Sequence, residues 1–208
     1  MPWICVDAGI AAGKSTLLDA LARDGVLVNK EPVGDPALGE RLAWDPFLDD
    51  LYGGVKGAAF AFQKRVVLDR ALSQESVSIG ESPNCWGVME RSPDMQRLTF
   101  VKMGALSDAE IMHVNEMYDR SVWQPACIIY LRVQPEISHA RMVARGRESE
   151  KGMSVDFHEK LHAMHEAAIE CIRSKGIPVH IVEDSNPDAV RASVRWIFDH
   201  YVKNGQGI

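Results

Sequence analysis

The sequence predicts an α/β fold in which about five parallel strands form a doubly wound sheet flanked by helices. Two observations carry this prediction. Short apolar runs alternate with segments of helical periodicity along the 208 residues, which is typical of β-α-β units. The first apolar run, residues 3–6, precedes a turn, a helix that ends before Gly25 and a second apolar run at 26–28. Because no linker or internal repeat interrupts the alternation, we expect one domain that spans 1–208.

The later elements follow the same alternation. Further strands are expected at 85–89, 126–131 and 178–182. Helices are expected at 36–44, 46–73, 95–103, 108–122, 135–144, 154–175 and from about 187 onward, and Gly53-Gly54 can bend the second of these.

Composition limits the class of protein. The chain is 46% hydrophobic and 25% charged, as in ordinary globular proteins, and its net charge is −6. An acidic chain lacks the broad basic surface that binds nucleic-acid polymers, so we expect small-molecule partners. The four cysteines form no close pairs, and neither a basic leader nor a membrane-spanning stretch is visible. We therefore expect a cytoplasmic protein with reduced thiols that binds no membrane.

Residues 7–16, Asp-Ala-Gly-Ile-Ala-Ala-Gly-Lys-Ser-Thr, predict a phosphate-binding loop between the first strand and the first helix. Backbone N–H groups of such a turn form an anion cradle, Lys14 reaches the outer phosphates and the Ser15 hydroxyl reaches Mg²⁺. The expected nucleotide-binding residues are Gly9, Ile10, Ala11, Ala12, Gly13, Lys14, Ser15 and Thr16. The usual first glycine is replaced by Ala8, so either Ala8 takes a backbone conformation normally left to glycine or the loop relaxes.

Charged residues follow two of the expected strands. Glu31 lies in the segment at 30–33 that leaves the second strand at its carboxyl end, and Glu90-Arg91-Ser92 follows the third. Because parallel sheets bind ligands at the carboxyl ends of their strands, we expect Glu31 to face the phosphate loop. The glycines and arginines at 145–152 predict a mobile lid that closes over phosphates.

Taken together, these motifs resemble the deoxynucleoside kinase family, which includes deoxycytidine, deoxyguanosine and mitochondrial thymidine kinases. The resemblance extends from about residue 3 to residue 201. Its most specific parts are Ile-Ala-Ala-Gly-Lys-Ser-Thr at 10–16, Glu-Pro-Val at 31–33, Phe-Gln at 62–63, Glu-Arg-Ser at 90–92, Arg-Gly-Arg at 145–147, Glu-Lys-Leu-His at 159–162 and His-Glu at 165–166. The resemblance implies a P-loop kinase fold and transfer of the γ-phosphate of ATP, or another nucleoside triphosphate, to the 5'-hydroxyl of a deoxynucleoside.

The resemblance also implies roles for the charged residues. Glu31 would accept the proton of the 5'-hydroxyl, Arg91 would hold Glu31 and the substrate, and Glu90 with Ser15 would bind Mg²⁺. The implied catalytic set is Glu31, Arg91, Lys14, Arg141, Arg145 and Arg147. Arg141 and Arg145, from the lid, would also bind the nucleotide, whose adenine would lie at Glu183, Asp184 and Ser185.

For the nucleoside, the resemblance implies that Tyr52 bonds the 3'-hydroxyl and Glu150 reaches the sugar. Gln63 would pair with the edge of the base, and Phe100 would stack on the base. Members that act on deoxycytidine or purines combine an arginine with an aspartate, and thymidine-preferring members have neither; here those positions carry Arg70 and Gln96. Arg70 therefore contacts the base, pairs with Asp69 or Asp94, or turns away, and this combination favours pyrimidines.

Other interpretations stay open from the sequence. His-Glu-Lys-Leu-His at 158–162 is a literal zinc motif, although the first histidine stands where the family has leucine. A thymidylate-type nucleoside monophosphate kinase would also have a P-loop and Glu-Pro, but with an arginine where this chain has Lys30. A GTPase-like switch or a degenerate nucleotide-binding protein is a third interpretation, for which Ala8 is the main argument. The family resemblance further implies a homodimer formed through helices near 48–74 and 94–121.

Overall fold

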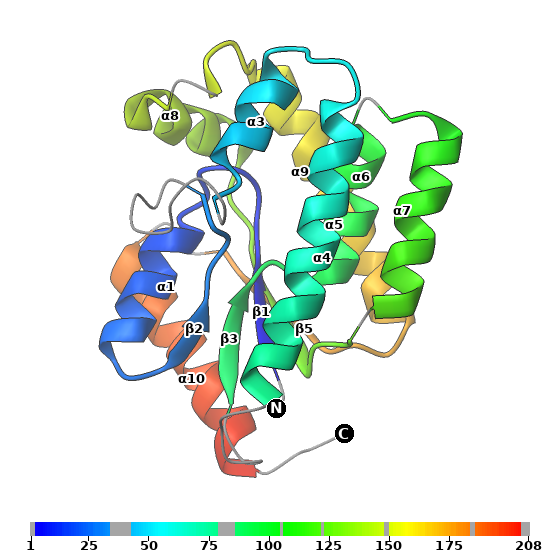
Figure 1. Cartoon of the computed structure of the whole chain (residues 1–208). Coiled ribbons are helices and arrows are strands. Elements are labelled where there is room, and N and C mark those ends of the chain that lie inside the picture. The colour runs from blue at the N-terminus through cyan, green and yellow to red at the C-terminus, as the bar shows by residue number, and fades with distance from the viewer. Residues whose placement is uncertain are drawn as a thin grey trace.

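The computed structural model describes residues 3–33, 43–78, 86–104, 106–121, 123–147, 150–183 and 186–204. Its centre is a five-stranded sheet with the order β2-β3-β1-β4-β5, in which every neighbouring pair is parallel (Figure 1). The strands are β1 Trp3–Asp7, β2 Leu27–Asn29, β3 Gly87–Glu90, β4 Cys127–Leu131 and β5 Val179–Val182. This confirms the predicted doubly wound, five-stranded parallel sheet.

Helices connect the strands and cover both faces of the sheet (Figure 1). They are α1 Lys14–Arg23, α3 Asp45–Tyr52, α4 Ala58–Ser78, α5 Pro93–Leu98, α6 Phe100–Met103, α7 Asp108–Ser121, α8 Pro135–Arg145, α9 Val155–Ser174 and α10 Pro187–Asn204. None of the described helices is long and apolar enough to cross a membrane.

The two faces of the sheet follow from alternation along β1. Because successive strand side chains point to opposite faces, Ile4 and Val6 pack on one side while Trp3 and Cys5 pack on the other. The first side is covered by leucines of α1 and by Val194, Ile197 and Phe198 of α10. The second side is covered by Met95 of α5 and by Ala168, Ile169 and Ile172 of α9.

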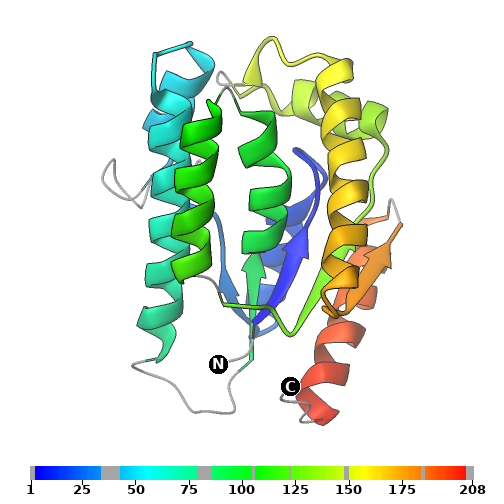
Figure 2. The same cartoon turned by 90° about the vertical axis from the view of Figure 1, so that its right-hand side faces the viewer.

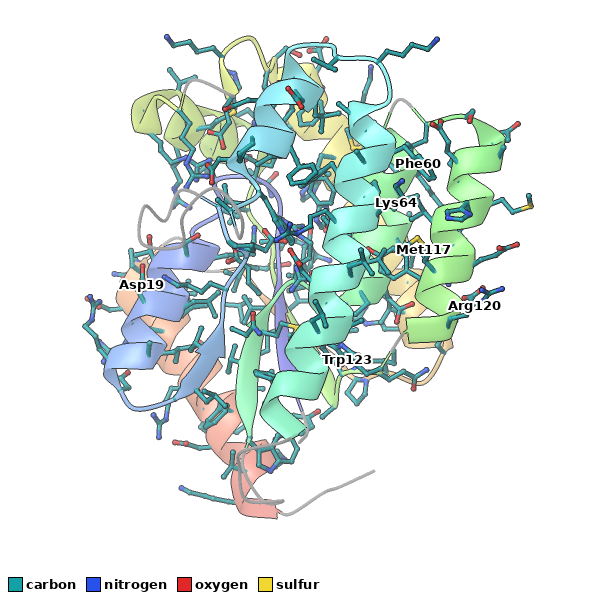
Figure 3. All side chains as sticks on the ribbon, in the orientation of Figure 1. Asp19, Phe60, Lys64, Met117, Arg120 and Trp123 are labelled. Carbon is teal, nitrogen blue, oxygen red and sulfur yellow. The ribbon has the colours of Figure 1, made fainter. Side chains whose placement is uncertain are left out.

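A separate layer consists of α4 and α7, which lie beside α5 on the outer side of the molecule (Figure 2). Figure 3 labels Phe60 on α4 and Met117 on α7, and both side chains pack against the apolar cluster that joins these helices. The buried members of this cluster are Val67, Val101, Val114 and Tyr118.

Two of the expected helices are divided in the structure. The helix expected at 46–73 is α3 and α4, separated by a turn in which Gly54 and Gly57 have φ angles of 73° and 82°. Such angles favour glycine. The helix expected at 95–103 is α5 and α6. The helix expected at 36–44 and the start of the strand at Cys85 lie largely or wholly outside the described residues.

Candidate active site

A cleft of about 720 Å³ lies at the carboxyl ends of the strands. The loop after β1, the segments after β2 and β3, and residues of α3, α4 and α8 line it. This is the edge at which an open parallel sheet places its ligands. The position of the cleft therefore follows from the strand order.

The phosphate loop contains two residues with left-handed backbone conformations. Gly13, at the start of α1, has φ 98°, and Ala11 has φ 55°. The Lys14 Nζ atom donates to the carbonyl oxygens of Ala8 at 3.2 Å and Gly9 at 3.0 Å. Burial, followed by the charge of Arg91, lowers the pKa of Lys14 to about 8. Lys14 is thus held at the loop in a position to meet an anion there.

The structure corrects one expectation for this loop. Among the described residues, the only non-glycine positions with positive φ are Ala11 and Arg91. Ala8 is fully buried in the main core and needs no left-handed conformation. Of the two alternatives, a glycine-like conformation at Ala8 is therefore wrong, and the alanine with the left-handed conformation is Ala11.

Two arginine side chains donate hydrogen bonds to the same carboxylate oxygen of Glu31. Its Oε1 accepts from Arg91 Nε at 2.9 Å and from Arg70 Nη2 at 2.9 Å. Burial alone would raise the pKa of Glu31, but Arg91, Arg70 and Lys14 outweigh it and lower that pKa below its ordinary value. Glu31 is therefore an ionised carboxylate at neutral pH, with two arginines bonded to one of its oxygens.

Glu90 lies beside Glu31 at the end of β3. Its Oε2 accepts the backbone N–H of Glu31 at 3.0 Å. Burial and then the charge of Glu31 raise the pKa of Glu90. Glu90 and Ser15 both line the cleft, so two oxygen ligands face the position that phosphates would take.

Arg91 joins the phosphate loop to the rest of the cleft. It has φ 64°, its backbone N–H donates to Val6 at 2.9 Å, and its Nη1 donates to the Ala8 carbonyl at 3.3 Å. Its guanidinium carbon lies 4.3 Å from the centre of the Phe100 ring. A left-handed arginine costs conformational energy, and such strain is concentrated at functional sites.

Asp7, at the end of β1, holds the segment after β3 through hydrogen bonds to Ser92. Its carboxylate oxygens accept the backbone N–H of Ser92 at 3.0 and 3.2 Å, and Ser92 in turn caps α5 through Met95 N–H at 3.1 Å. Burial raises the pKa of Asp7 to about 6. The pattern of the loop gives no sign of this bond, because it depends on the pairing of β1 with β3.

The other side of the cleft combines amides and rings. Gln96 Nε2 donates to Gln63 Oε1 at 3.1 Å, and both side chains are buried. The rings of Trp44 and Phe62 meet edge to face, with their centres 5.6 Å apart. With Phe100, these groups line a part of the cleft that combines apolar rings with polar amides.

The arginines at the end of α8 pair with Glu150. Arg145 Nη2 donates to both oxygens of Glu150 at 2.6 and 2.8 Å, and Arg147 Nη1 lies 3.7 Å away from Oε1. Burial and then the charge of Glu150 raise the pKa of Tyr52 to about 12. Tyr52 and Glu150 therefore face the same region of the cleft.

Comparison with known proteins decides the family of this chain. A model of the family described as deoxynucleoside kinase matches residues 4–196. The chain belongs to the deoxynucleoside kinase family. The protein designated 029R of Invertebrate iridescent virus 3 is 30% identical over 188 residues, which are 88% of this chain and 89% of that protein. Deoxycytidine kinase 1 of Xenopus laevis is 29% identical over 192 residues, with 78% and 72% covered.

A solved structure of deoxyadenosine kinase from M. mycoides, with products dCMP and a flexible dCDP bound, has a similar fold. The TM-score is 0.77 at 18% sequence identity, and the match covers 95% of this chain and 99% of that one. The family assignment makes this chain a kinase that acts on deoxynucleosides with a nucleotide as phosphate donor.

Most residues expected for a deoxynucleoside kinase site are brought together in the cleft. Those that line it are Ile10, Ala11, Ala12, Gly13, Lys14, Ser15, Thr16, Glu31, Tyr52, Gln63, Glu90, Arg91, Gln96, Phe100, Arg141, Arg145, Arg147 and Glu150. Gly9, Arg70 and Glu183 do not line it. The Glu183 side chain instead pairs with Arg132, and Asp184 and Ser185 lie outside the described residues, as do residues 148 and 149 of the lid.

Arg70 has a different partner from those expected. Asp69 accepts from Arg65 and Trp44, and Asp94 accepts from Lys175. Of the three alternatives left open for Arg70, pairing with Asp69 or Asp94 is wrong, because Arg70 pairs with Glu31. Each of these aspartates pairs with another cation instead of Arg70.

Other residues line the cleft to which the sequence analysis assigned no site role, although Val33 and Phe62 belong to motifs quoted there. The apolar residues among them include Val33, Trp44, Leu48, Leu51 and Phe62, and the charged ones include Arg23, Asp188 and Arg191. Trp44, Leu48 and Leu51 recur at helical spacing, which was a signal for a buried face but not for a ligand-facing one.

The His-Glu-x-x-His motif is divided between two environments. His158 is buried, with its Nδ1 2.8 Å from Ser138 Oγ and its Nε2 facing the sulfur of Met142. His162 instead lies 3.8 Å from Glu166. The two histidines thus make separate contacts with protein groups.

Proposed function

We propose that this kinase transfers the γ-phosphate of ATP to the 5'-hydroxyl of pyrimidine deoxynucleosides, such as thymidine or deoxycytidine. The observation that carries the proposal is Glu31, an ionised carboxylate that two arginines hold in the same cleft as Lys14. A carboxylate placed opposite a phosphate loop suits the activation of a hydroxyl acceptor.

In the proposed reaction, Glu31 accepts the proton of the 5'-hydroxyl as the oxygen attacks the γ-phosphorus. Lys14 and the loop N–H groups bind the phosphates, and the lid arginines neutralise charge as it moves to the leaving oxygen. Tyr52 and Glu150 orient the sugar through its 3'-hydroxyl. Positioning and charge neutralisation supply most of the rate enhancement in this chemistry.

Mg²⁺ fits the oxygen donors Ser15 and Glu90, and it would neutralise charge on the β- and γ-phosphates. The described part of the chain has no group of three or more His, Cys, Asp or Glu side chains suited to a metal ion. Phosphate oxygens and water would therefore complete the coordination, as is common for Mg²⁺.

The proposed preference for pyrimidines rests on the combination of Arg70 with the neutral Gln96. Gln63 Oε1 accepts from Gln96, so the Gln63 amide can donate to an acceptor on the base edge, which pyrimidines and purines both have. Arg70 is directed to Glu31 and does not line the cleft. The Xenopus laevis relative, a deoxycytidine kinase by name, agrees with a pyrimidine substrate.

The test is phosphate transfer by purified protein with Mg-ATP and a panel of deoxynucleosides and deoxynucleoside monophosphates. We expect pyrimidine deoxynucleosides to be the best acceptors. Monophosphates as the only acceptors would show a monophosphate kinase, and purine deoxynucleosides as the best acceptors would refute the base preference alone. Other triphosphates in place of ATP test the donor in the same assay.

We also propose a cytoplasmic homodimer. The outer surface of α4 and α7 exposes Leu68, Leu72 and Met112, so these helices are apolar beyond the faces they bury. Sedimentation of the wild-type protein should give twice the chain mass, and Leu72→Glu should shift it to one chain mass.

The proposed compartment rests on the cysteines. The described cysteines are free thiols, which suits a reducing compartment.

A further inference from the structure

Arg70 is a buried cation whose partner decides what it does. The residue lies on α4, is 5% exposed, and has an Nε atom with no hydrogen-bond partner in the described structure. Burying a guanidinium is costly unless a carboxylate and further acceptors compensate the charge. The compensating groups therefore show where Arg70 acts.

Glu31 is the only carboxylate among the described residues that forms an ion pair with Arg70. The nearby acids Asp69 and Asp94 form ion pairs with Arg65 and Lys175. Gln96 is neutral and donates to Gln63. Arg70 Nη1 also donates to the Glu90 carbonyl oxygen at the end of β3. The Arg70 guanidinium carbon lies 5.8 Å from the centre of the Trp44 ring.

The two carboxylate oxygens of Glu31 differ in their hydrogen-bond partners. Arg70 Nη2 and Arg91 Nε both lie 2.9 Å from Oε1. No donor from the described residues is within hydrogen-bond distance of Oε2. Two guanidinium groups that come from different elements, α4 and the end of β3, therefore fix one oxygen and leave the other for a ligand.

We propose that Arg70 is a positioning residue for phosphoryl transfer, which anchors Oε1 of Glu31 so that Oε2 accepts the proton of the 5'-hydroxyl. It does not select the base. This inference rests on the proposed function, in which Glu31 is the base. Its consequence is that the residue pair Arg70 and Gln96 has two separate tasks: Arg70 serves the reacting hydroxyl, and Gln96 serves the base through Gln63.

The first experiment compares Arg70→Lys and Arg70→Met with the wild type, with thymidine and deoxycytidine as acceptors. We expect kcat of Arg70→Met to fall about 10- to 100-fold for both acceptors, with KM changed less than about threefold. The ratio of kcat/KM between the two acceptors should stay within about twofold. Arg70→Lys, which retains the charge but not the two-pronged geometry, should recover part of kcat.

The matched control is Arg97→Met. Arg97 is also paired, with Asn115 and Asp119, but it does not line the cleft. Its kcat and KM should match those of the wild type. Thermal unfolding of each variant shows whether a loss of kcat comes with loss of fold, and the lysine variant provides the kinetic answer if the methionine variant does not fold.

The second experiment asks whether Arg70 acts through Glu31. In a Glu31→Gln background, Arg70→Met should cost less than about twofold more in kcat, because the anchored group is already gone. Guanidinium ion added at millimolar concentration should restore part of the kcat of Arg70→Ala, but not that of Arg70→Ala with Glu31→Gln.

Three outcomes would overturn the inference. These are a kcat/KM ratio between the acceptors that changes about tenfold or more while kcat is retained, a full additional loss in the Glu31→Gln background, or an unchanged kcat in Arg70→Met. Each leaves the proposed function intact if the wild type transfers phosphate to deoxynucleosides. A wild type that transfers none refutes the proposed function first.

Discussion

The two sides of the cleft differ in how deeply their charged side chains are buried. We call the side around Glu31 the acceptor side and the side around Arg145 and Glu150 the lid side. On the acceptor side, the side chains of Arg70 and Arg91 are each 6% exposed, and that of Glu31 is 14% exposed. On the lid side, the side chains of Arg145 and Arg147 are 33% and 36% exposed. The acceptor side is anchored at strand ends, whereas the lid side follows the end of α8.

This difference in burial indicates that the charged groups on the two sides would respond differently to a bound substrate. The acceptor carboxylate already has the partners that its proposed role requires, so no reorganisation is needed when the hydroxyl arrives. Arg145 instead forms two bonds to Glu150, and these neutralise its charge within the lid. To reach a phosphate, Arg145 has to exchange one anionic partner for another, as lids that close over substrates do.

The largest effect expected from this comparison belongs to Glu31→Gln. Glutamine fits the same space but cannot accept the proton, so kcat should fall about 10²- to 10⁴-fold while nucleotide binding is retained. Turnover by coupled assay and nucleotide affinity by calorimetry measure the two quantities. Glu170→Gln, an exposed change on α9, is the control. Full turnover in Glu31→Gln would remove the acceptor side from the chemistry.

The next effect concerns the packing beneath the acceptor side. His165 is fully buried, stacks on Tyr130 with 10° between the ring planes, and meets Phe100 edge to face. Burial and then the charge of Arg91 lower the pKa of His165 to about 3. The unfolded chain has the ordinary histidine pKa of about 6.5. The unfolded state thus binds the proton first, and stability is lost as the pH falls below about 6.5.

His165→Phe removes this titration. Between pH 7 and pH 4, the wild type should lose on the order of 3 kcal/mol more unfolding free energy than the variant. Urea unfolding at both pH values measures the difference, and His113→Gln on the exposed face of α7 is the control. Equal losses in the wild type and His165→Phe would show that the acceptor side does not depend on a neutral histidine.

Much of the fold and the acceptor side could be predicted because both depend on local patterns. Apolar runs mark the strands; Arg91 directly follows β3, and Glu31 is the second residue after β2. Parallel pairing brings such strand ends together without further information. The order β2-β3-β1-β4-β5 then places both residues beside the phosphate loop.

The sequence could not predict which of several chemically similar residues forms a given contact in the folded chain. Arg70 has acids at positions 69 and 94 as candidates, but each forms an ion pair with another cation in the folded chain. The apolar cleft residues Trp44 and Leu48 have the helical spacing of an ordinary core face, and only tertiary packing turns them to the cleft. Contacts between distant segments decide both cases.

A smaller effect tests the lid side. In Glu150→Gln, Arg145 loses its ionic partner and Tyr52 loses the neighbouring charge, so the sugar contacts weaken while the phosphate contacts need no exchange. We expect KM for the deoxynucleoside to rise about tenfold and kcat to change less than about threefold. Glu136→Gln, at the exposed first turn of α8, is the control. A loss of kcat as large as that of Glu31→Gln would contradict the division between the two sides.

The smallest effect separates the two alanines of the phosphate loop. Ala11 has φ 55°, a conformation that costs an L-residue about 1 kcal/mol, so Ala11→Gly relieves strain that roughly offsets the greater freedom of glycine in the unfolded chain. Ala8 has no such strain and its methyl group is buried in the core, so Ala8→Gly should cost about 1 to 2 kcal/mol. Chemical unfolding of the pair measures the contrast. If Ala8→Gly were the more stable variant, the loop would need glycine where the family pattern has it, and the backbone described for this loop would be wrong.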